Sequence, residues 1–92
     1  MTGQRIHVFI TGKVQGVYFR KSMKTKAEQN RVNGWVKNLK DGRVEAVIEG
    51  ESKNVDLTLE WCHGGPGGSV VEDVVMHKEE YAAEFDSFEI IY

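Results

Sequence analysis

Five stretches of the chain carry the hydrophobic pattern of β-strands. The first is the clearest, because Ile6, Val8 and Ile10 occupy every second position. Alternation with a period of two, in β-branched residues, predicts a strand with one buried face. The second and third stretches are joined through Asp41-Gly42, a dipeptide that favours a hairpin turn. The strands predicted in this way cover residues 5–11, 34–39, 43–49, 70–77 and 88–92.

Two further stretches have hydrophobic residues at helical spacing. Phe19, Met23 and Ala27 recur every four residues, and this spacing predicts a helix that reaches about residue 30. A second helix is predicted over 52–62, and the glycine-rich segment 63–66 ends it. The order β-α-β-β-α-β plus a C-terminal strand predicts an α+β fold, a ferredoxin-like split βαβ sandwich. In that arrangement an antiparallel sheet carries the two helices on one face, and its other face is free.

Length and composition fit one small soluble domain that covers residues 1–92. The chain is 40% hydrophobic and 28% charged, and a domain of about 100 residues normally has a single core. No apolar run approaches the roughly 20 residues that span a bilayer, and the first residues do not resemble a signal peptide. The lone cysteine, Cys62, cannot form an internal disulfide, which is typical of a reducing compartment. We therefore expect a cytoplasmic protein in which Cys62 is a core residue of the second helix.

The charged residues are distributed unevenly along the chain. Residues 1–43 contain ten of the twelve Lys and Arg residues, and residues 44–92 contain twelve of the fourteen Asp and Glu residues. The two parts therefore carry formal charges of +8 and −10, although the whole chain carries only −2. Such asymmetry suggests that the first part faces an anion. In a fold that interleaves the two parts the charges would instead partly neutralise each other, and the sequence leaves both interpretations open.

The segment 12–20 has the features of an anion-binding loop. It joins the first strand to the first helix, and Gly12 and Gly16 allow it to curl so that successive backbone N–H groups point inward. The helix N-terminus adds unsatisfied N–H groups and a partial positive charge. Arg20, at the end of the loop, offers a planar fork to two phosphate oxygens. The alternative is an ordinary glycine turn followed by a surface arginine, and spacing alone does not exclude it.

Several other kinds of site are disfavoured. Val17 and Tyr18 stand where a P-loop beginning at Gly12 would need glycine and lysine, and no GxGxxG sequence occurs. In a Cys-x5-Arg motif starting at Cys62, the arginine position is occupied by Gly68. No serine stands in a GxSxG elbow. The histidines have no metal-ligand spacing, so no metal site is predicted; they are His7, His63 and His77.

A second group of candidate residues lies at the end of the second predicted strand. A carboxamide at a strand end offers both a donor and an acceptor, so Asn38 could hold a water molecule through its oxygen. The alternative role for Asn38 is a turn asparagine that caps the 39–42 loop. Trp35, on the same strand, is either a core residue or a wall of the site, and its position does not decide between the two.

Two runs of the sequence resemble the signatures of the acylphosphatase family. The first is Gly12-Lys13-Val14-Gln15-Gly16-Val17-Tyr18-Phe19-Arg20, and the second is Gly34-Trp35-Val36-Lys37-Asn38 followed by Gly42, Val44 and Gly50. The similarity continues to the last strand and so covers nearly the whole chain. It implies the ferredoxin-like fold and an enzyme that hydrolyses a carboxyl phosphate to a carboxylate and inorganic phosphate, without metal, cofactor or phosphoenzyme.

The resemblance also assigns roles to individual residues. It implies that Arg20 binds the phosphate and that Asn38 orients the attacking water. An acyl phosphate has a good leaving group, so positioning and charge stabilisation suffice for its hydrolysis. The expected partner is a small-molecule acyl phosphate, and we expect a monomer that binds neither nucleic acid nor membrane. The backbone amides expected to cradle the phosphate are those of Gln15, Gly16, Val17, Tyr18, Phe19 and Arg20.

One departure from the family pattern lies at the end of the first helix. Many relatives carry Leu-Gly-Leu where this chain has Asn30-Arg31-Val32. Without the glycine, the left-handed residue that ends the helix falls to Asn30 or Arg31, at a cost of about 1 kcal/mol.

Two other functions stand as alternatives. A ferredoxin-like sheet can bind RNA on its exposed face, and the basic first part offers stacking surfaces at Phe9, Tyr18 and Trp35. The aromatic RNP1 pattern is absent, which disfavours this function. The second alternative is a domain of the same fold that senses acyl or carbamoyl phosphate without turnover, and it is disfavoured because Arg20 and Asn38 are both present.

Overall fold

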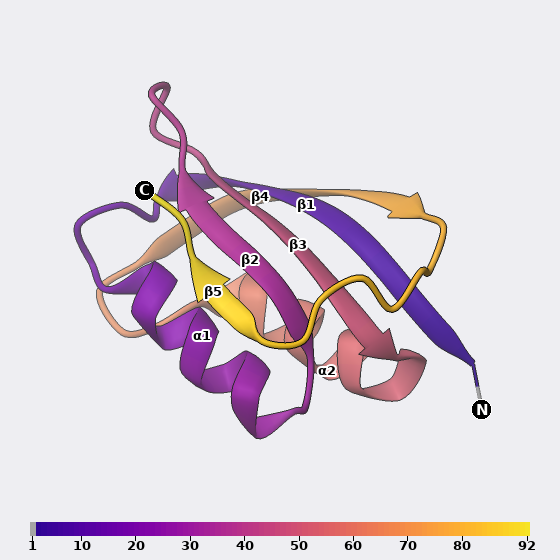
Figure 1. The fold of residues 1–92 in the computed structure, drawn as a ribbon. Coiled ribbons are helices and arrows are strands. Elements are labelled where there is room, and N and C mark those ends of the chain that lie inside the picture. Colours follow the sequence, from indigo (N-terminus) through magenta and orange to yellow (C-terminus); the bar gives the residue numbers. More distant parts are fainter. Residues whose placement is uncertain (1) are drawn as a thin grey trace.

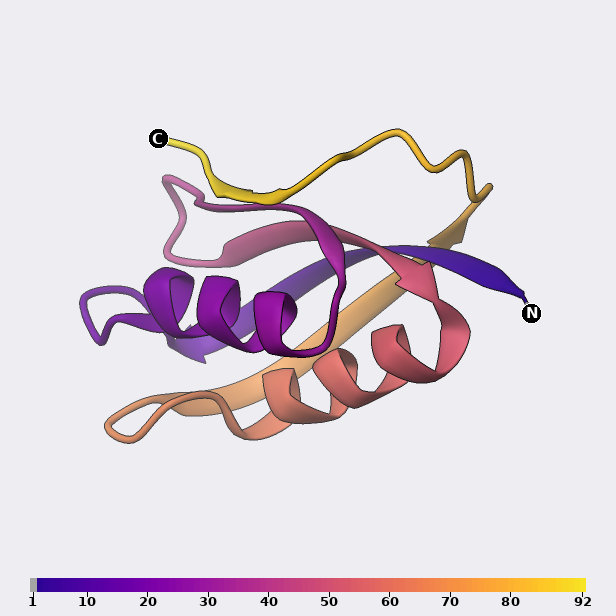
Figure 2. The same cartoon turned by 60° about the horizontal axis from the view of Figure 1, so that its bottom comes forward.

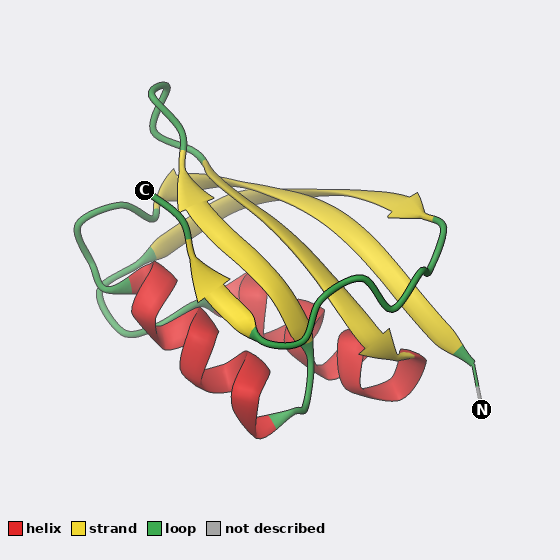
Figure 3. Cartoon of the chain, in the orientation of Figure 1, coloured by secondary structure: helices red, strands yellow, loops and turns green. Residues whose placement is uncertain are grey.

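The chain forms its helices and strands in the predicted order, and the computed structural model describes residues 2–92 (Figure 1). Strands occupy the stretches with alternating hydrophobic residues and helices occupy the two stretches with four-residue spacing, which confirms the predicted α+β class (Figure 3). The elements are β1 (Gly3–Lys13), α1 (Phe19–Gln29), β2 (Asn33–Asn38), β3 (Val44–Glu51), α2 (Ser52–Gly64), β4 (Val70–Glu79) and β5 (Phe88–Ile90).

The strands form one sheet in the order β4-β1-β3-β2-β5. β1 pairs with β3 and β4, and β3 pairs with β2, in each case antiparallel. β5 differs, because it pairs with β2 in parallel, with Gly34 opposite Phe88. The segment 80–87 explains the difference: it carries the chain along one end of the sheet from the β4 edge to the β5 edge, and a strand that starts there runs in the direction of β2 (Figure 1). The sheet is therefore mixed, and the expected antiparallel pairing holds for four of its strands.

The core lies between the sheet and the two helices, which cover the same face of the sheet (Figure 2). The alternating residues of β1, Ile6, Val8 and Ile10, point into this layer and are buried together with Met23 of α1 and Leu59 of α2. Each such side chain contributes roughly 1.5–3 kcal/mol when it leaves water. Both hydrophobic stripes predicted from the sequence thus form the core. Among residues 2–92, no helix is long and apolar enough to cross a membrane.

α1 ends in a left-handed residue, and that residue is Arg31. Its φ is 56°, whereas Asn30 has a φ of −90°. The N–H of Arg31 donates to the carbonyl oxygen of Glu28 at 3.2 Å, and the N–H of Val32 donates to that of Ala27 at 2.8 Å. These two bonds form a Schellman motif, in which the hydrogen-bond register decides which residue is left-handed.

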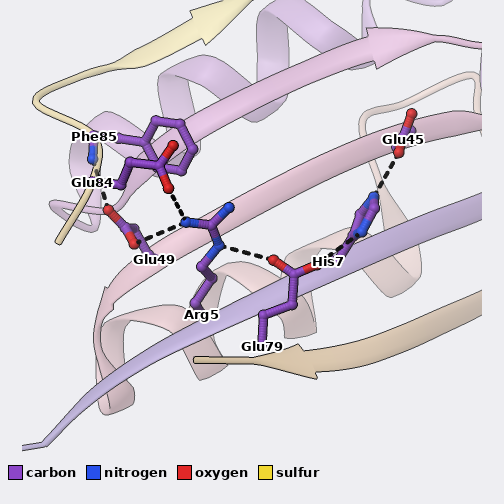
Figure 4. A network of polar contacts seen from close by, with 7 residues as sticks. All are labelled: Arg5, His7, Glu45, Glu49, Glu79, Glu84 and Phe85. Carbon is purple, nitrogen blue, oxygen red and sulfur yellow. Dashed lines mark hydrogen bonds and ion pairs between the residues drawn. The ribbon is translucent and has the colours of Figure 1, made fainter. Parts of the chain in front are cut away.

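The basic and acidic parts of the sequence are interleaved, because β1 lies between β3 and β4. Arg5 of β1 forms ion pairs with Glu79 at 2.9 Å and with Glu84 at 2.7 Å (Figure 4). The nearly fully buried Glu49 of β3 lies 3.9 Å from the same guanidinium, and its other oxygen accepts the N–H of Phe85 at 2.8 Å. These contacts fasten the segment 80–87 to the sheet. They also neutralise part of the charge asymmetry, as one of the two interpretations of the sequence anticipated.

Candidate active site

The segment between β1 and α1 curls because two of its residues have a left-handed backbone. Gly16 has a φ of 72° and Tyr18, which immediately precedes α1, has a φ of 58°. Val14 and Phe19 are fully buried and fix both ends of the curl in the core. Left-handed residues next to right-handed ones turn successive N–H groups to one side, which is the geometry of an anion nest. These backbone angles are compatible with an anion nest at the N-terminus of α1, where the helix adds partial positive charge.

Arg20 is the second residue of α1 and stands directly after this loop. Its guanidinium carbon lies 5.0 Å from the ring centre of Tyr92, a cation–π contact. In the part of the chain that the structure describes, Arg20 forms no ion pair with a carboxylate. Its positive charge is therefore not neutralised by a carboxylate within residues 2–92.

The side chain of Gln15 ties the loop to the β2–β3 hairpin. Its Nε2 donates to the carbonyl oxygens of Leu39 at 2.8 Å and of Arg43 at 3.0 Å. The hairpin itself is closed by the N–H of Leu39, which donates to the carbonyl oxygen of Arg43 at 2.8 Å. Asn38 ends β2 just before this turn, so Gln15 holds the loop and Asn38 in a fixed relation.

Asn38 is half-buried at the end of β2 and does not cap the turn. Its Oδ1 is buried and accepts no hydrogen bond from residues 2–92. Buried acceptors in folded proteins are nearly always satisfied. Asp41 contacts the turn instead. Its Oδ1 accepts the backbone N–H of Arg43 at 3.1 Å, and its Oδ2 accepts the Nε–H of Arg43 at 2.8 Å. These two hydrogen bonds lower the pKa of Asp41. Asn38 is therefore no turn cap, and its Oδ1 is a buried acceptor without a partner among residues 2–92.

The loop, α1, β2 and the C-terminal segment meet around one cavity of about 640 Å³. Gly16 and Tyr18 line it from the loop, Arg20 from α1, Asn38 from the end of β2 and Tyr92 from beyond β5. The two side chains that the sequence singled out are thus brought to the same place. The other lining residues are Val14, Phe19, Lys21, Lys24 and Ile90.

A family model described as Acylphosphatase matches residues 6–90. The chain belongs to the acylphosphatase family. It is 48% identical over 89 residues to an acylphosphatase of Syntrophus aciditrophicus, which covers 97% of this chain and 93% of that relative. It is 54% identical over 88 residues to one from Pyrobaculum arsenaticum, covering 95% and 93% of the two chains. Its structure matches that of an acylphosphatase from Coxiella burnetii with a TM-score of 0.92 and 38% identity, covering 97% of this chain and 93% of the other.

Not every residue that the sequence singled out lines the cavity of this acylphosphatase. Gln15 and Val17 belong to the loop but do not line the cavity, since the Gln15 side chain turns to the hairpin and Val17 packs against the core. Trp35 is neither a core residue nor a wall of the site. It lies on the strand face opposite that of the buried Val36, with its ring centre 5.5 Å from the Lys37 ammonium.

Lys24, Ile90 and Tyr92 also line the cavity, although no motif of the sequence singled them out. Lys24 reaches it from α1, where its ammonium donates to the carbonyl oxygen of Phe88 at 2.7 Å and so joins α1 to β5. Ile90 and Tyr92 reach it from the end of the chain. The four-residue helical spacing puts Lys24 on the same side of α1 as Arg20, and that spacing is the one signal that could have identified it.

The remaining candidates of the sequence lie outside this site. Cys62 is buried in α2, and burial raises the pKa of its thiol to about 12, so it does not supply a thiolate at neutral pH. This confirms the expectation that Cys62 is a core residue. No group of three or more His, Cys, Asp or Glu residues within 2–92 is arranged to hold a metal ion.

Proposed function

We propose that this chain hydrolyses the carboxyl–phosphate bond of acyl phosphates to a carboxylate and inorganic phosphate, with Arg20 and Asn38 as its catalytic residues. The observation that carries the proposal is the shared cavity, which is lined by a guanidinium without a carboxylate partner, by a curled loop at a helix N-terminus and by Asn38, whose Oδ1 has no hydrogen-bond partner within residues 2–92. Membership of the acylphosphatase family supports the same reaction.

In this proposal the phosphoryl group binds in the loop. The backbone amides of residues 15–20 and the partial charge of the α1 N-terminus bind its oxygens, and Arg20 donates two parallel hydrogen bonds to them. Hydrogen bonds to charged groups contribute roughly 1.5–3 kcal/mol each. As the bond to the leaving carboxylate opens, the same donors stabilise the charge on the equatorial oxygens.

The attacking water is held by Asn38. Its Oδ1 accepts a hydrogen bond from the water, which places the water oxygen in line with the phosphorus and the leaving oxygen. The new bond forms between water and phosphorus while the bond to the acyl oxygen breaks, and the leaving carboxylate keeps the electron pair. The proton released by the water passes to a phosphate oxygen of the substrate, so the proposal needs neither a protein base, a phosphoenzyme nor a metal ion.

The proposal describes residues 1–92 as one domain that works alone. Residues of one chain line the cavity on the sides of the loop, α1, β2 and the C-terminal segment, and the proposal takes a monomer as the unit that turns over a small acyl phosphate. Nucleic acid and membranes have no part in the proposal. A cytoplasmic location is proposed from the lone cysteine, which is typical of reducing compartments.

The test is turnover of benzoyl phosphate and acetyl phosphate in the presence of EDTA. Release of inorganic phosphate under these conditions supports both the reaction and its independence of metal ions. Turnover that EDTA abolishes would contradict direct attack by an unassisted water. Phosphate or carbamoyl phosphate binding without any turnover would identify a sensing domain instead.

A further inference from the structure

Tyr18 carries a large side chain at a position where the fold gains nothing from it. Its φ is 58°, in the left-handed region where a Cβ is strained and glycine is favoured. Its side chain is 78% exposed, and within residues 2–92 its ring takes part in none of the aromatic or cation–π contacts that Phe19 and Tyr92 form. Strained residues of this kind are concentrated at functional sites. The ring of Tyr18 therefore needs an explanation other than packing.

Tyr18, Ile90 and Tyr92 form the apolar rim of the cavity that contains Arg20 and Asn38. Two further apolar residues line this cavity, but they are fully buried in the core and so lie at its base; they are Val14 and Phe19. The rim residues are instead exposed or half-buried, so a bound molecule can contact them. In both views the loop and the C-terminal segment lie at the same end of the molecule (Figure 1, Figure 2).

The cavity is larger than the phosphoryl group and the attacking water require. Its volume is about 640 Å³, and cavities of roughly 300–1,000 Å³ hold whole drug-sized ligands. Sites of this kind combine a few polar groups that orient the ligand with apolar and aromatic walls that contact the rest of it. Room and apolar contact surface therefore remain for the acyl group of the substrate.

The apolar rim lies beside the group that would bind the phosphate. The ring centre of Tyr92 is 5.0 Å from the guanidinium carbon of Arg20. In an acyl phosphate only the bridging oxygen separates the phosphorus from the acyl carbon, so a phosphoryl group held by Arg20 brings the acyl group to the rim. We propose that the apolar rim binds the acyl group and that Tyr18 makes the site selective for aromatic or large apolar acyl groups. This inference rests on the proposed hydrolysis of acyl phosphates.

The size of the acyl group decides whether it benefits from Tyr18. The phenyl ring of benzoyl phosphate can pack against the ring of Tyr18, and aromatic pairs are stabilising beyond the area that they bury. Acetyl phosphate offers only a methyl group. Removal of the Tyr18 ring should therefore reduce the use of benzoyl phosphate more than the use of acetyl phosphate.

Steady-state kinetics of Tyr18→Gly tests this selectivity. Glycine keeps the left-handed backbone and the loop amide, and it removes only the side chain. The ratio of kcat/KM for benzoyl phosphate to that for acetyl phosphate should fall about three- to tenfold relative to the parent protein. A disturbance of the phosphate-binding loop would lower turnover of both substrates alike, and it cancels in the ratio. The different intrinsic reactivities of the two substrates cancel in the same comparison.

Two further variants separate the ring from other effects. Tyr18→Phe keeps the ring and loses the hydroxyl, so its ratio should equal that of the parent protein. Tyr81→Gly is the matched control, because it makes the same change at an exposed tyrosine that does not line the cavity, and its ratio should not change either. An unchanged ratio in Tyr18→Gly, or an equal fall in Tyr18→Phe, would overturn the role of the Tyr18 ring.

Binding of two unreactive phosphonates separates this proposal from the proposed reaction. In acetonylphosphonate and phenacylphosphonate a methylene replaces the bridging oxygen, so neither can be hydrolysed. Titration calorimetry should show that the parent protein binds phenacylphosphonate at least about threefold more tightly, and that Tyr18→Gly loses this preference. Such a preference in a protein that turns over no acyl phosphate would refute the reaction and support the rim. Equal affinities in the parent protein, or no binding of either phosphonate, would refute the rim even if acyl phosphates are hydrolysed.

Discussion

Arg20 is the residue on which phosphate binding and charge stabilisation should both depend. It has no carboxylate partner within residues 2–92 and stands beside the loop amides that line the cavity. Arg20→Ala is therefore expected to abolish turnover and to weaken inhibition by inorganic phosphate, because the guanidinium contacts the phosphoryl group in the ground state and in the transition state. Steady-state kinetics with benzoyl phosphate, with phosphate as the inhibitor, measures both effects.

Lys26→Ala is the matched control for Arg20→Ala. It removes one positive charge from the same helix at a position that does not line the cavity. Turnover and phosphate inhibition should both stay near those of the parent protein. Near-normal turnover in Arg20→Ala would contradict the assignment of Arg20.

Asn38 should affect turnover without affecting phosphate binding. Its oxygen faces the water and not the phosphoryl group in the proposed arrangement. Asn38→Ala is expected to lower kcat on the order of 10²-fold, because the water is no longer held in line, while the inhibition constant for phosphate stays the same. An equal loss of phosphate binding in this variant would show that Asn38 binds the phosphate and does not position the water.

Several of the residues that the sequence singled out line the cavity, but the sequence did not indicate the rest of its lining. Arg20, Asn38 and the loop glycines stand in continuous runs, so their spacing is visible in the chain. Ile90 and Tyr92 reach the cavity because β5 pairs with β2 beside α1. No local pattern encodes that pairing. The sequence also left open which face of the sheet carries Trp35. Trp35 and Val36 point to opposite faces, and which of the two faces is buried depends on where the helices pack.

At the scale of elements, Gln15 couples the phosphate loop to the hairpin that carries Asn38. Gln15→Ala keeps the backbone amide but removes both hydrogen bonds to Leu39 and Arg43. We expect kcat to fall on the order of tenfold, because Asn38 is positioned less well, with phosphate inhibition nearly unchanged. The free energy of unfolding should fall by about 1–2 kcal/mol. Gln29→Ala, an exposed glutamine of α1, should change neither quantity, and equal kinetics in both variants would argue against the coupling.

The end of α1 offers a separate prediction about stability. Arg31 adopts a left-handed backbone, with a φ of 56°, where a residue with a Cβ is strained. Arg31→Gly relieves this strain and is expected to raise the free energy of unfolding by about 0.5–1 kcal/mol. Arg31→Ala loses the same charge but keeps the Cβ, so it should show no gain. Denaturant unfolding measures the difference, and equal midpoints for the two variants would contradict the argument.

The order and type of the elements followed from hydrophobic spacing, whereas the direction of β5 did not. Alternating and four-residue patterns are local, so they mark each strand and helix of the chain. The parallel pairing of β5 depends on the path of 80–87, which is held by contacts between Arg5, Glu49 and Glu84 that are distant in the sequence. Similarly, the sequence allowed Asn30 or Arg31 as the left-handed residue, and the helix hydrogen bonds select Arg31.

At the scale of the whole molecule, the basic residues of the first part of the chain have two different environments. Some of them form ion pairs with the acidic part, as Arg5 does. The region near the cavity stays cationic, because Arg20 and Lys21 form no ion pair within residues 2–92, while Lys24 is shared with Glu28 and Glu89 at 3.5 and 3.8 Å. A small anion should therefore be attracted to this end of the molecule even though the net charge of the chain is −2.

Raising the concentration of potassium chloride should increase KM by a larger factor than it lowers kcat. Salt screens the attraction between the dissolved substrate and the cationic cavity, whereas contacts made inside the cavity are screened much less. Lys21→Ala should make KM less dependent on salt, because it removes one charge from the lining, and Lys53→Ala on the exposed side of α2 should leave the dependence unchanged. If chloride simply competed for Arg20, KM would rise equally in both variants. A KM that does not change with salt would mean that the ion pairs of the fold neutralise the basic residues and leave no net attraction for the substrate.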